Sequence, residues 1–261
     1  MKPCSAKTGE PDFGNWIRLQ RVAGVLIVSI ASLMGGVFLP PMWMWLLRAI
    51  AMGGLAMGLF LLFVYYQFDD RGGGVQRQLW RLTLDHLDGD RSGSALDIGT
   101  GNGSLAIMLA MEAGSLCVTG VDLWNADWEY SMDDCVRNAV RCGVGERVKF
   151  ERASAEALPF PDETFDNVVS HFVFHEVASA GNKLDVVKEA LRVLRPSGHF
   201  SFHDMFFDVD LYGDPRNLES QVKSLGVDSV RLIDSRALLH VPSVLMGKRI
   251  LGNCGILCGR K

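Results

Sequence analysis

The chain has 261 residues, which is enough for one complete α/β domain and a smaller additional part. Its formal net charge of -4 offers no basic surface to a polyanion, so the composition argues against a dedicated nucleic-acid-binding protein. The six cysteines are scattered through a chain too large to depend on disulfides, and we expect them to be reduced. Cys254 and Cys258 have no second ligand pair at zinc spacing, so no metal site is predicted.

The first quarter of the chain is strongly apolar. Residues 1–21 are polar and are expected to form a cytoplasmic tail. Two charge-free runs follow, Val22 to Leu39 and Ala49 to Phe68, and each is long enough for a helix to cross a hydrocarbon core of roughly 30 Å. We therefore predict a two-helix transmembrane hairpin over residues 22–68 that binds the lipid bilayer. Two buried helices of a soluble protein are the alternative, whereas a cleaved signal peptide is disfavoured because no cleavage site closes the first run.

The flanking charges give this hairpin an orientation. Cationic residues gather before the first run and after the second, so the positive-inside tendency places both ends, and the domain that follows, in the cytoplasm. Within the second run, Gly54 and Gly58 form a G-x-x-x-G spacing that lets two helix backbones approach closely. This spacing either packs the hairpin on itself or pairs two copies as a homodimer. Three glycines then mark a linker over residues 69–74.

From residue 75 to residue 261, candidate strands alternate with candidate helices. The first strand leads into Asp97, and the other six are expected at residues 116–123, 148–152, 165–174, 199–206, 229–233 and 255–259. The helices are expected at residues 76–87, 105–112, 132–142, 183–195 and 215–225, with Pro196-Ser197-Gly198 ending the fourth. Strands separated by helices predict an α/β fold with a doubly wound, mostly parallel, seven-stranded sheet.

A glycine-rich stretch follows the first strand. Ser94 to Ser104 reads S-A-L-D-I-G-T-G-N-G-S, in which an apolar strand runs into an acid and three alternating glycines precede a helix. Such a loop needs glycine because its backbone angles exclude side chains and a ligand lies against the main chain. A dinucleotide fingerprint would place its last glycine at position 104, which is a serine, so a dehydrogenase is disfavoured. Asp97, Gly99, Gly101 and Gly103 instead resemble motif I of the S-adenosylmethionine (SAM)-dependent methyltransferases of class I, whose fold is Rossmann-like.

Two further segments resemble the same family. Asp122 stands where the family places the acid that binds both ribose hydroxyls, and Leu123 and Trp124 stand where apolar side chains cover the adenine. Ala153 to Asp166 (A-S-A-E-A-L-P-F-P-D-E-T-F-D) is similar to the G-D-A-E-x-L-P-F segment of small-molecule and lipid-quinone methyltransferases. The resemblance puts Ser154 in place of the aspartate that holds the adenine amino group, and Ala155 where a backbone N–H meets the ring. A hydroxyl is a weaker acceptor than a carboxylate, so adenine recognition departs from the family pattern here.

The resemblance continues to the fifth strand. Phe165 to Val177 looks like motif IV and its loop, which implies that main chain near Ser170 and His171 contacts the methionine amino group of the cofactor. Glu189 to Phe200 matches a helix-turn-strand signature of the family, to which we assign an architectural role without chemistry. The cofactor that the resemblance implies is SAM.

Methyl transfer is an in-line displacement, and it needs a general base only when the acceptor must lose a proton. His175 is the preferred catalytic candidate and His171 the second, although each is also compatible with a packing role. The predicted protein is a membrane-anchored methyltransferase with a lipid or other lipophilic small-molecule acceptor. The alternatives are a membrane-protein or soluble-metabolite acceptor, and a non-catalytic binding or assembly module of the same fold.

Overall fold

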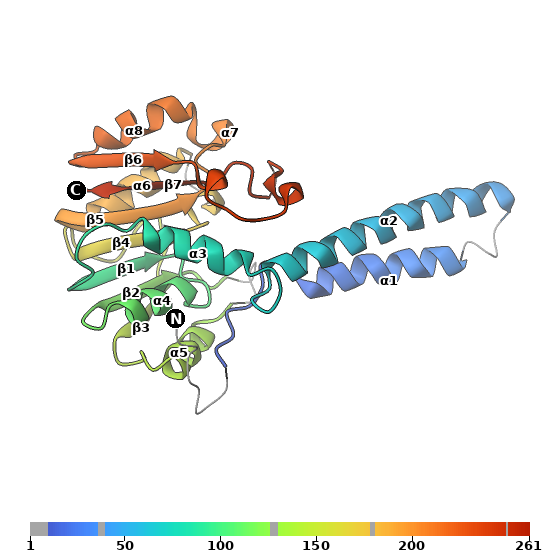
Figure 1. The fold of residues 1–261 in the computed structure, drawn as a ribbon, viewed down its shortest axis with the longest axis horizontal. Helices are drawn as coiled ribbons and strands as arrows, with labels where there is room; N and C mark the ends of the chain where they lie inside the picture. The colour runs from blue at the N-terminus through green and yellow to red at the C-terminus, as the bar shows by residue number, and fades with distance from the viewer. Residues whose placement is uncertain (1–9, 36–39, 126–129, 178–180, 249) are drawn as a thin grey trace. The chain divides into compact units, whose positions relative to one another are not determined.

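The computed structural model describes residues 10–35, 40–125, 130–177, 181–248 and 250–261 (Figure 1). The chain divides into two compact units. One contains the described residues up to Phe13 together with Leu79–Lys261, and the other contains Gly14–Gln78.

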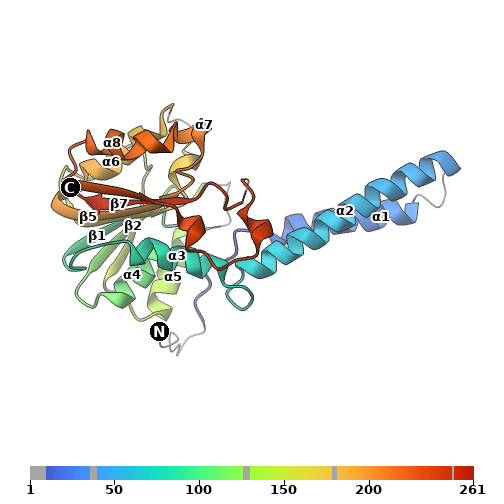
Figure 2. The same ribbon diagram turned by 45° about the horizontal axis from the view of Figure 1, so that its top comes forward.

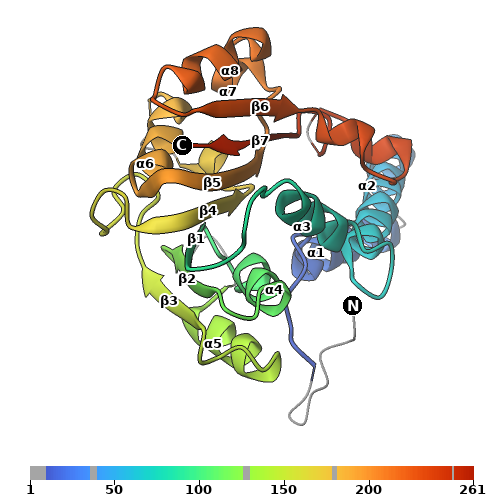
Figure 3. The same cartoon turned by 60° about the vertical axis from the view of Figure 1, so that its left-hand side comes forward.

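The first unit is built on a seven-stranded sheet with the strand order β3-β2-β1-β4-β5-β7-β6 (Figure 3). The strands are β1 (Ser94–Ile98), β2 (Cys117–Asp122), β3 (Val148–Arg152), β4 (Phe165–His171), β5 (Leu194–Asp204), β6 (Ser229–Ile233) and β7 (Gly255–Arg260). The first five strands pair in parallel, while β7 runs antiparallel to both β5 and β6. The predicted doubly wound, mostly parallel sheet of seven strands is confirmed.

Helices cover both faces of this sheet (Figure 2). They are α3 (Val75–Asp85), α4 (Ser104–Glu112), α5 (Met132–Arg141), α6 (Lys183–Arg192), α7 (Val209–Tyr212) and α8 (Pro215–Lys223). Neighbouring strand residues point to opposite faces, so Ala95 joins the core under α4 and Leu96 joins the core under α6. Since both faces are covered, the central strands are apolar throughout rather than alternating.

Two element ends differ from the sequence prediction. Strand β4 stops at His171, and Phe174 lies in a short 3-10 turn rather than in the strand. Helix α6 stops at Arg192, and the Pro196–Gly198 turn signal falls inside β5, where the pairing with β4 shifts register. The cause is tertiary, because Ser197 donates its N–H to the Lys261 carbonyl and Lys261 donates to the Gly198 carbonyl at 3.0 Å.

The second unit contains α1 (Leu19–Gly35) and α2 (Pro41–Phe68). Helix α2 begins at Pro41 rather than at Ala49, because proline suits the first helical position, where its missing N–H costs nothing. Arg48, which stands between the two charge-free runs in the sequence, therefore lies inside this helix. Among the described residues, α2 is the one helix long and apolar enough to cross a membrane, and only 17% of its most apolar 18-residue window is buried.

Of the two predicted spans, the second thus coincides with a helix that has the length and composition of a membrane span. Helix α1 is apolar but has 17 residues, and residues 36–39 of the expected first span lie outside the described residues. At about 1.5 Å per residue, α1 is shorter than a hydrocarbon core of roughly 30 Å.

The G-x-x-x-G spacing packs the two helices of this unit together. A Cβ atom at Gly54 would lie 2.1 Å from Ser29 Oγ, and one at Gly58 would lie 2.3 Å from Leu26 Cδ2. Because α1 already covers these glycines, the alternative of a homodimer through Gly54 and Gly58 has no support from this surface.

The predicted linker is a hydrogen-bonded turn. Asp69 donates its N–H to the Tyr65 carbonyl at 3.0 Å, and Gly73 donates to the Tyr66 carbonyl at 3.0 Å. Gly74 then takes a φ of 64°, which favours glycine, and α3 begins at the next residue. These glycines close the end of α2 rather than form an open spacer.

Candidate active site

The glycine loop has the geometry that its sequence predicts. Gly99, Gly101 and Gly103 have φ angles of 73°, 55° and 78°, all in the region that favours glycine. A Cβ atom at Gly99 would lie 2.1 Å from the Val173 side chain, so the loop after β4 approaches this main chain closely. The loop follows β1 at the carboxyl ends of the parallel strands, where ligands collect in open α/β sheets.

Asp97 shapes this loop from within the protein. Its side chain is buried, and Oδ2 accepts hydrogen bonds from Thr100 Oγ1 at 2.7 Å and from the Ala106 N–H at 3.1 Å. Burial raises the pKa of Asp97 to about 7. Asp97 therefore ties the loop to the first turn of α4, which means that it would act on a ligand through the main chain.

Asp122 lies directly beside the glycine loop. Its Oδ2 accepts from the Gly101 N–H and its Oδ1 from the Trp124 N–H, both at 2.9 Å. Each carboxylate oxygen keeps a second lone pair, so the group can still accept two hydroxyl donors. The neighbouring Leu123 is half exposed and offers an apolar surface. A carboxylate beside the glycine main chain that can still accept two hydroxyl donors fits a ligand that carries vicinal hydroxyls.

Trp124 differs from its predicted role. Its side chain is buried, its φ is 41°, and its Nε1–H donates to the Gly101 carbonyl at 2.9 Å. The indole therefore lies against the glycine loop instead of forming an open cover beside Leu123.

The Ala153 segment lies next to Asp122. Ala153 donates its N–H to the Asp122 carbonyl at 3.1 Å, and Ser154 pairs with Ala157 through an isolated bridge. Ser154 Oγ accepts from the Glu156 N–H at 3.3 Å, which leaves one lone pair for a ligand. Ala155 packs against the core at the turn between them.

Ser170 and His171 are the last two residues of β4. Ser170 Oγ donates to the Ile98 carbonyl at 2.9 Å, so its side chain joins neighbouring strands and only its main chain remains for a cofactor. His171 is buried, with Nδ1 2.8 Å from Thr83 Oγ1, and burial holds its pKa well below the usual value. A buried imidazole of such low basicity is a poor general base, which disfavours His171.

His175 forms a pair with a buried carboxylate. Its Nδ1 lies 2.6 Å from Asp204 Oδ1, and its backbone N–H donates to Asp204 Oδ2 at 3.3 Å. Burial is the largest single influence on His175 and lowers its pKa, but the charge and the hydrogen bond of Asp204, together with the charge of Glu176, raise the pKa by more, so the net pKa is raised. The side chain is 20% exposed, against 2% for Asp204. An imidazole held at Nδ1 by a buried carboxylate has the arrangement of a general base with its orienting partner.

Sequence reasoning missed a contact from the predicted tail. Asn138 of α5 donates to the Asp12 carbonyl at 2.7 Å, accepts from the Asp12 N–H at 3.0 Å and donates to the Asn102 carbonyl in the glycine loop at 3.2 Å. The Phe13 ring meets Trp80 edge-on with centroids 5.9 Å apart. Residues 10–13 therefore belong to the sheet unit, although their polar sequence contains no periodic pattern that would indicate it.

Comparison with known proteins shows which protein family has a site of this kind. A family model described as a methyltransferase domain matches residues 96–202, which include the glycine loop, Asp122, the Ala153 segment and the β4 loop. The chain contains a class I SAM-dependent methyltransferase domain. SAM is accordingly its cofactor, and the glycine main chain and Asp122 of the domain fit that molecule.

Two relatives of known function are similar in sequence to this domain, and the name of each refers to a small molecule. The chain is 34% identical over 173 residues to 27-O-demethylrifamycin SV methyltransferase of Amycolatopsis mediterranei, covering 64% of this chain and 59% of that protein. It is 37% identical over 132 residues to the ubiquinone/menaquinone biosynthesis C-methyltransferase UbiE of Pseudomonas fluorescens, covering 50% of this chain and 48% of that protein. The chain thus spans about half to three fifths of the length of these two relatives.

Solved structures support the fold of the methyltransferase domain. The [4+2]-cyclase SpnF aligns with a TM-score of 0.51 at 18% identity and covers 75% of this chain and 82% of that one. A geranyl diphosphate methyltransferase in complex with GPP and sinefungin aligns with a TM-score of 0.51 at 16% identity, covering 69% and 76%. At these identities the likeness concerns the fold alone, and one fold hosts several reactions.

Proposed function

We propose that this chain transfers the methyl group of SAM to a small lipophilic acceptor that loses a proton, with His175 as general base. The observation that carries the proposal is the 2.6 Å contact between His175 Nδ1 and the buried Asp204 carboxylate. His175 lies in the short turn after β4 and Asp204 is the last residue of β5, so the pair lies at the edge of the sheet where the glycine loop follows β1. The relatives named above, one an O-methyltransferase of a rifamycin and one a quinone C-methyltransferase, support a small-molecule acceptor.

The chain's own residues divide the work between binding and proton transfer. SAM supplies an electrophilic methyl group on a sulfonium. The main chain of Gly99, Gly101 and Gly103 receives its methionyl part, together with the main chain at Ser170 and His171. Asp122 accepts from the ribose hydroxyls, Leu123 covers the adenine, and Ser154 and Ala155 meet its edge. Asp204 holds the Nδ1–H of His175, so that Nε2 takes the acceptor's proton during attack.

We also propose that the protein is anchored in a membrane with its catalytic domain facing the cytoplasm. Helix α2 has 28 residues, and its apolar side chains are largely exposed outside the contact with α1. Exposed apolar surface of this extent needs a lipid environment or a partner. An anchored enzyme meets membrane-dissolved acceptors at high local concentration, which favours a lipid or another lipophilic molecule as the acceptor.

A non-catalytic binding module is the second candidate, and Ser154 is the feature that favours it. The hydroxyl replaces the family's carboxylate at the adenine and is partly used by the Glu156 N–H. A titration of the full chain with SAM is the first test of the two candidates, because a domain that binds no cofactor cannot transfer its methyl group.

Methyl-labelled SAM tests the proposed activity. Membrane extracts are incubated with the detergent-solubilised protein, and the label is followed into the lipid fraction, the soluble metabolites and the protein. We expect label in the lipid fraction with the wild-type chain and none with His175→Ala. Label found only in protein would indicate a membrane-protein acceptor, and label found only in water-soluble metabolites would indicate a soluble-metabolite acceptor. SAM binding without any transfer would support the binding module.

A further inference from the structure

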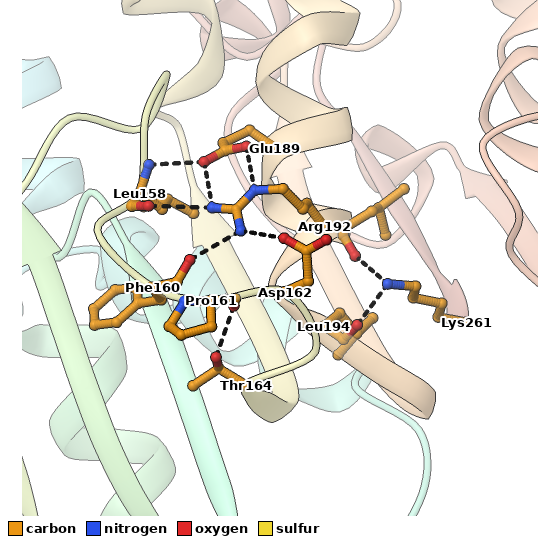
Figure 4. Close-up of polar contacts among 10 residues, drawn as sticks. Leu158, Phe160, Pro161, Asp162, Thr164, Glu189, Arg192, Leu194 and Lys261 are labelled. Atoms are coloured by element: carbon orange, nitrogen blue, oxygen red, sulfur yellow. Dashed lines mark hydrogen bonds and ion pairs between the residues drawn. The ribbon is translucent and has the colours of Figure 1, made fainter.

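The carboxyl end of α6 holds a network of hydrogen bonds to the Ala153–Asp166 segment (Figure 4). The Arg192 guanidinium donates to both Glu189 carboxylate oxygens at 2.8 Å, to Asp162 Oδ1 at 2.7 Å, and to the carbonyls of Phe160 at 2.9 Å and Leu158 at 3.1 Å. Glu189 Oε1 also accepts from the Leu158 N–H at 2.8 Å. The pair therefore satisfies three main-chain groups of Leu158 and Phe160, which lie in no regular strand or helix.

These contacts combine charge with a fixed geometry. A guanidinium that grips a carboxylate in a bidentate manner still has planar donors for nearby carbonyls, which lysine cannot reproduce. The Arg192 side chain is 30% exposed and that of Glu189 is 16% exposed, so solvent screens this pair less than a fully exposed one. The Arg192 guanidinium lowers the pKa of Glu189, which keeps the carboxylate ionised.

The end of α6 is itself held from the other side. Lys261 Nζ donates to the carbonyls of Leu191 and Leu194 at 2.9 and 2.7 Å, two carbonyls that flank the end of the helix (Figure 4). Hydrogen bonds from Lys261 therefore hold the end of α6 that carries Arg192.

The network fixes one end of a very short turn. At the other end, Ala153 donates its N–H to the Asp122 carbonyl at 3.1 Å. Between these two fixed points lies the bridge from Ser154 to Ala157, and Leu158 is the next residue. Only four residues separate Ala153 from Leu158. A displacement of Leu158 therefore also displaces Ser154 and Ala155, the residues assigned to the adenine edge.

We propose that Glu189 and Arg192 are positioning residues that hold Ser154 and Ala155 in the conformation that recognises the adenine base of the cofactor. The inference deepens the proposed function, because it rests on SAM binding by this segment. It replaces the purely architectural role expected for the α6 end, since the helix contributes selectivity for the base through hydrogen bonds to main chain.

The test uses two ligands that differ only at the base. S-adenosylhomocysteine carries the 6-amino group of adenine, and S-inosylhomocysteine carries a keto group in its place. Calorimetry on the full chain in detergent gives the affinity of each ligand for the wild type and for Arg192→Met. We expect the variant to bind S-adenosylhomocysteine about tenfold more weakly and S-inosylhomocysteine with nearly the same affinity, so that the preference for adenine is lost.

Arg195→Met is the matched control. Arg195 lies three residues after Arg192, in β5, and it also pairs with a carboxylate, since its Nη1 lies 2.7 Å from Asp166 Oδ1. Its contacts, with Glu163 and Asp166, fall beyond the turn at Ser154. Its removal should leave both affinities unchanged. Glu189→Gln serves if Arg192→Met does not fold. It keeps an acceptor for Leu158 but loses the charge, and we expect about a threefold loss for S-adenosylhomocysteine alone.

The outcomes distinguish this inference from the proposed function. If the wild type binds neither ligand, the proposed function fails. If the wild type binds both ligands equally, if Arg192→Met and Glu189→Gln keep the wild-type preference, or if Arg195→Met has the same effect as Arg192→Met, the positioning role is overturned while SAM binding stands.

Discussion

His175 and Asp204 form the pair on which catalysis is proposed to depend. Because a general base must be neutral, activity should fall as the pH drops through the raised pKa of His175, above its ordinary value of 6.5. Asp204→Asn removes the charge that raises this pKa and leaves burial to lower it. The acid limb of kcat should then move to lower pH, and the plateau should fall because Nδ1–H is held less firmly. Initial rates against pH at saturating SAM measure both effects, and an unmoved acid limb would separate His175 from the reaction.

Asp122 combines a role in the loop with the proposed ribose contact. Asp122→Ala removes the acceptor of the Gly101 N–H as well as the acceptors offered to the ribose. SAM affinity should fall by about 1.5 to 3 kcal/mol, the usual range for hydrogen bonds to a charged group. Calorimetry measures this loss, with Asp88→Ala as the control, since Asp88 pairs with Arg231 on an exposed surface. Unchanged affinity would remove Asp122 from the site.

Ser154 tests the departure from the family pattern. Ser154→Asp keeps an acceptor for the Glu156 N–H and adds a charged acceptor for the adenine amino group, so SAM should bind more tightly by about 0.5 to 1.5 kcal/mol. Ser154→Ala should weaken binding by a similar amount. If neither change alters the affinity of the folded protein, the adenine contact lies elsewhere.

At the scale of elements, the glycine loop is shaped by its contact with the loop after β4. Gly99→Ala forces a side chain into a φ of 73° and against Val173, 2.1 Å from the new Cβ. We expect a loss of about 1 to 3 kcal/mol in the free energy of unfolding and a larger loss of SAM binding, because the strain falls on the ligand surface. Gly114→Ala is the control, since nothing lies within 4 Å of its Cβ position. Thermal melts with and without SAM compare the two, and equal melts would contradict the close approach at Gly99.

At the scale of the whole molecule, we expect the sheet unit to bind SAM without the helices α1 and α2. A chain that begins at Val75 should be soluble and bind SAM, because the sheet and its helices lie downstream. It should melt at a lower temperature than the full chain, since Phe13 no longer covers Trp80 and Asn138 loses Asp12. Reporter fusions at the N-terminus and after Gly74 should both read cytoplasmic. If the truncated chain cannot fold even when residues 10–13 are restored to it through a short linker, residues 14–74 are part of the core and the anchor proposal fails.

The sequence alone determined the features that depend on neighbours along the chain. The strand-loop-helix at Asp97 to Gly103, the sheet with its strands separated by helices, and the apolar length of α2 all follow from local periodicity and from the backbone angles that glycine permits.

Only the tertiary structure decided which distant groups meet. It pairs His175 with Asp204, 29 residues away, directs His171 into the core, and gives Gly54 to the packing of α1 on α2. It also extends β5 through Pro196–Gly198 because the C-terminal residue pairs there. These contacts cannot be predicted from local sequence patterns. The free energy that stabilises them comes from burial and hydrogen bonding between segments far apart in the chain.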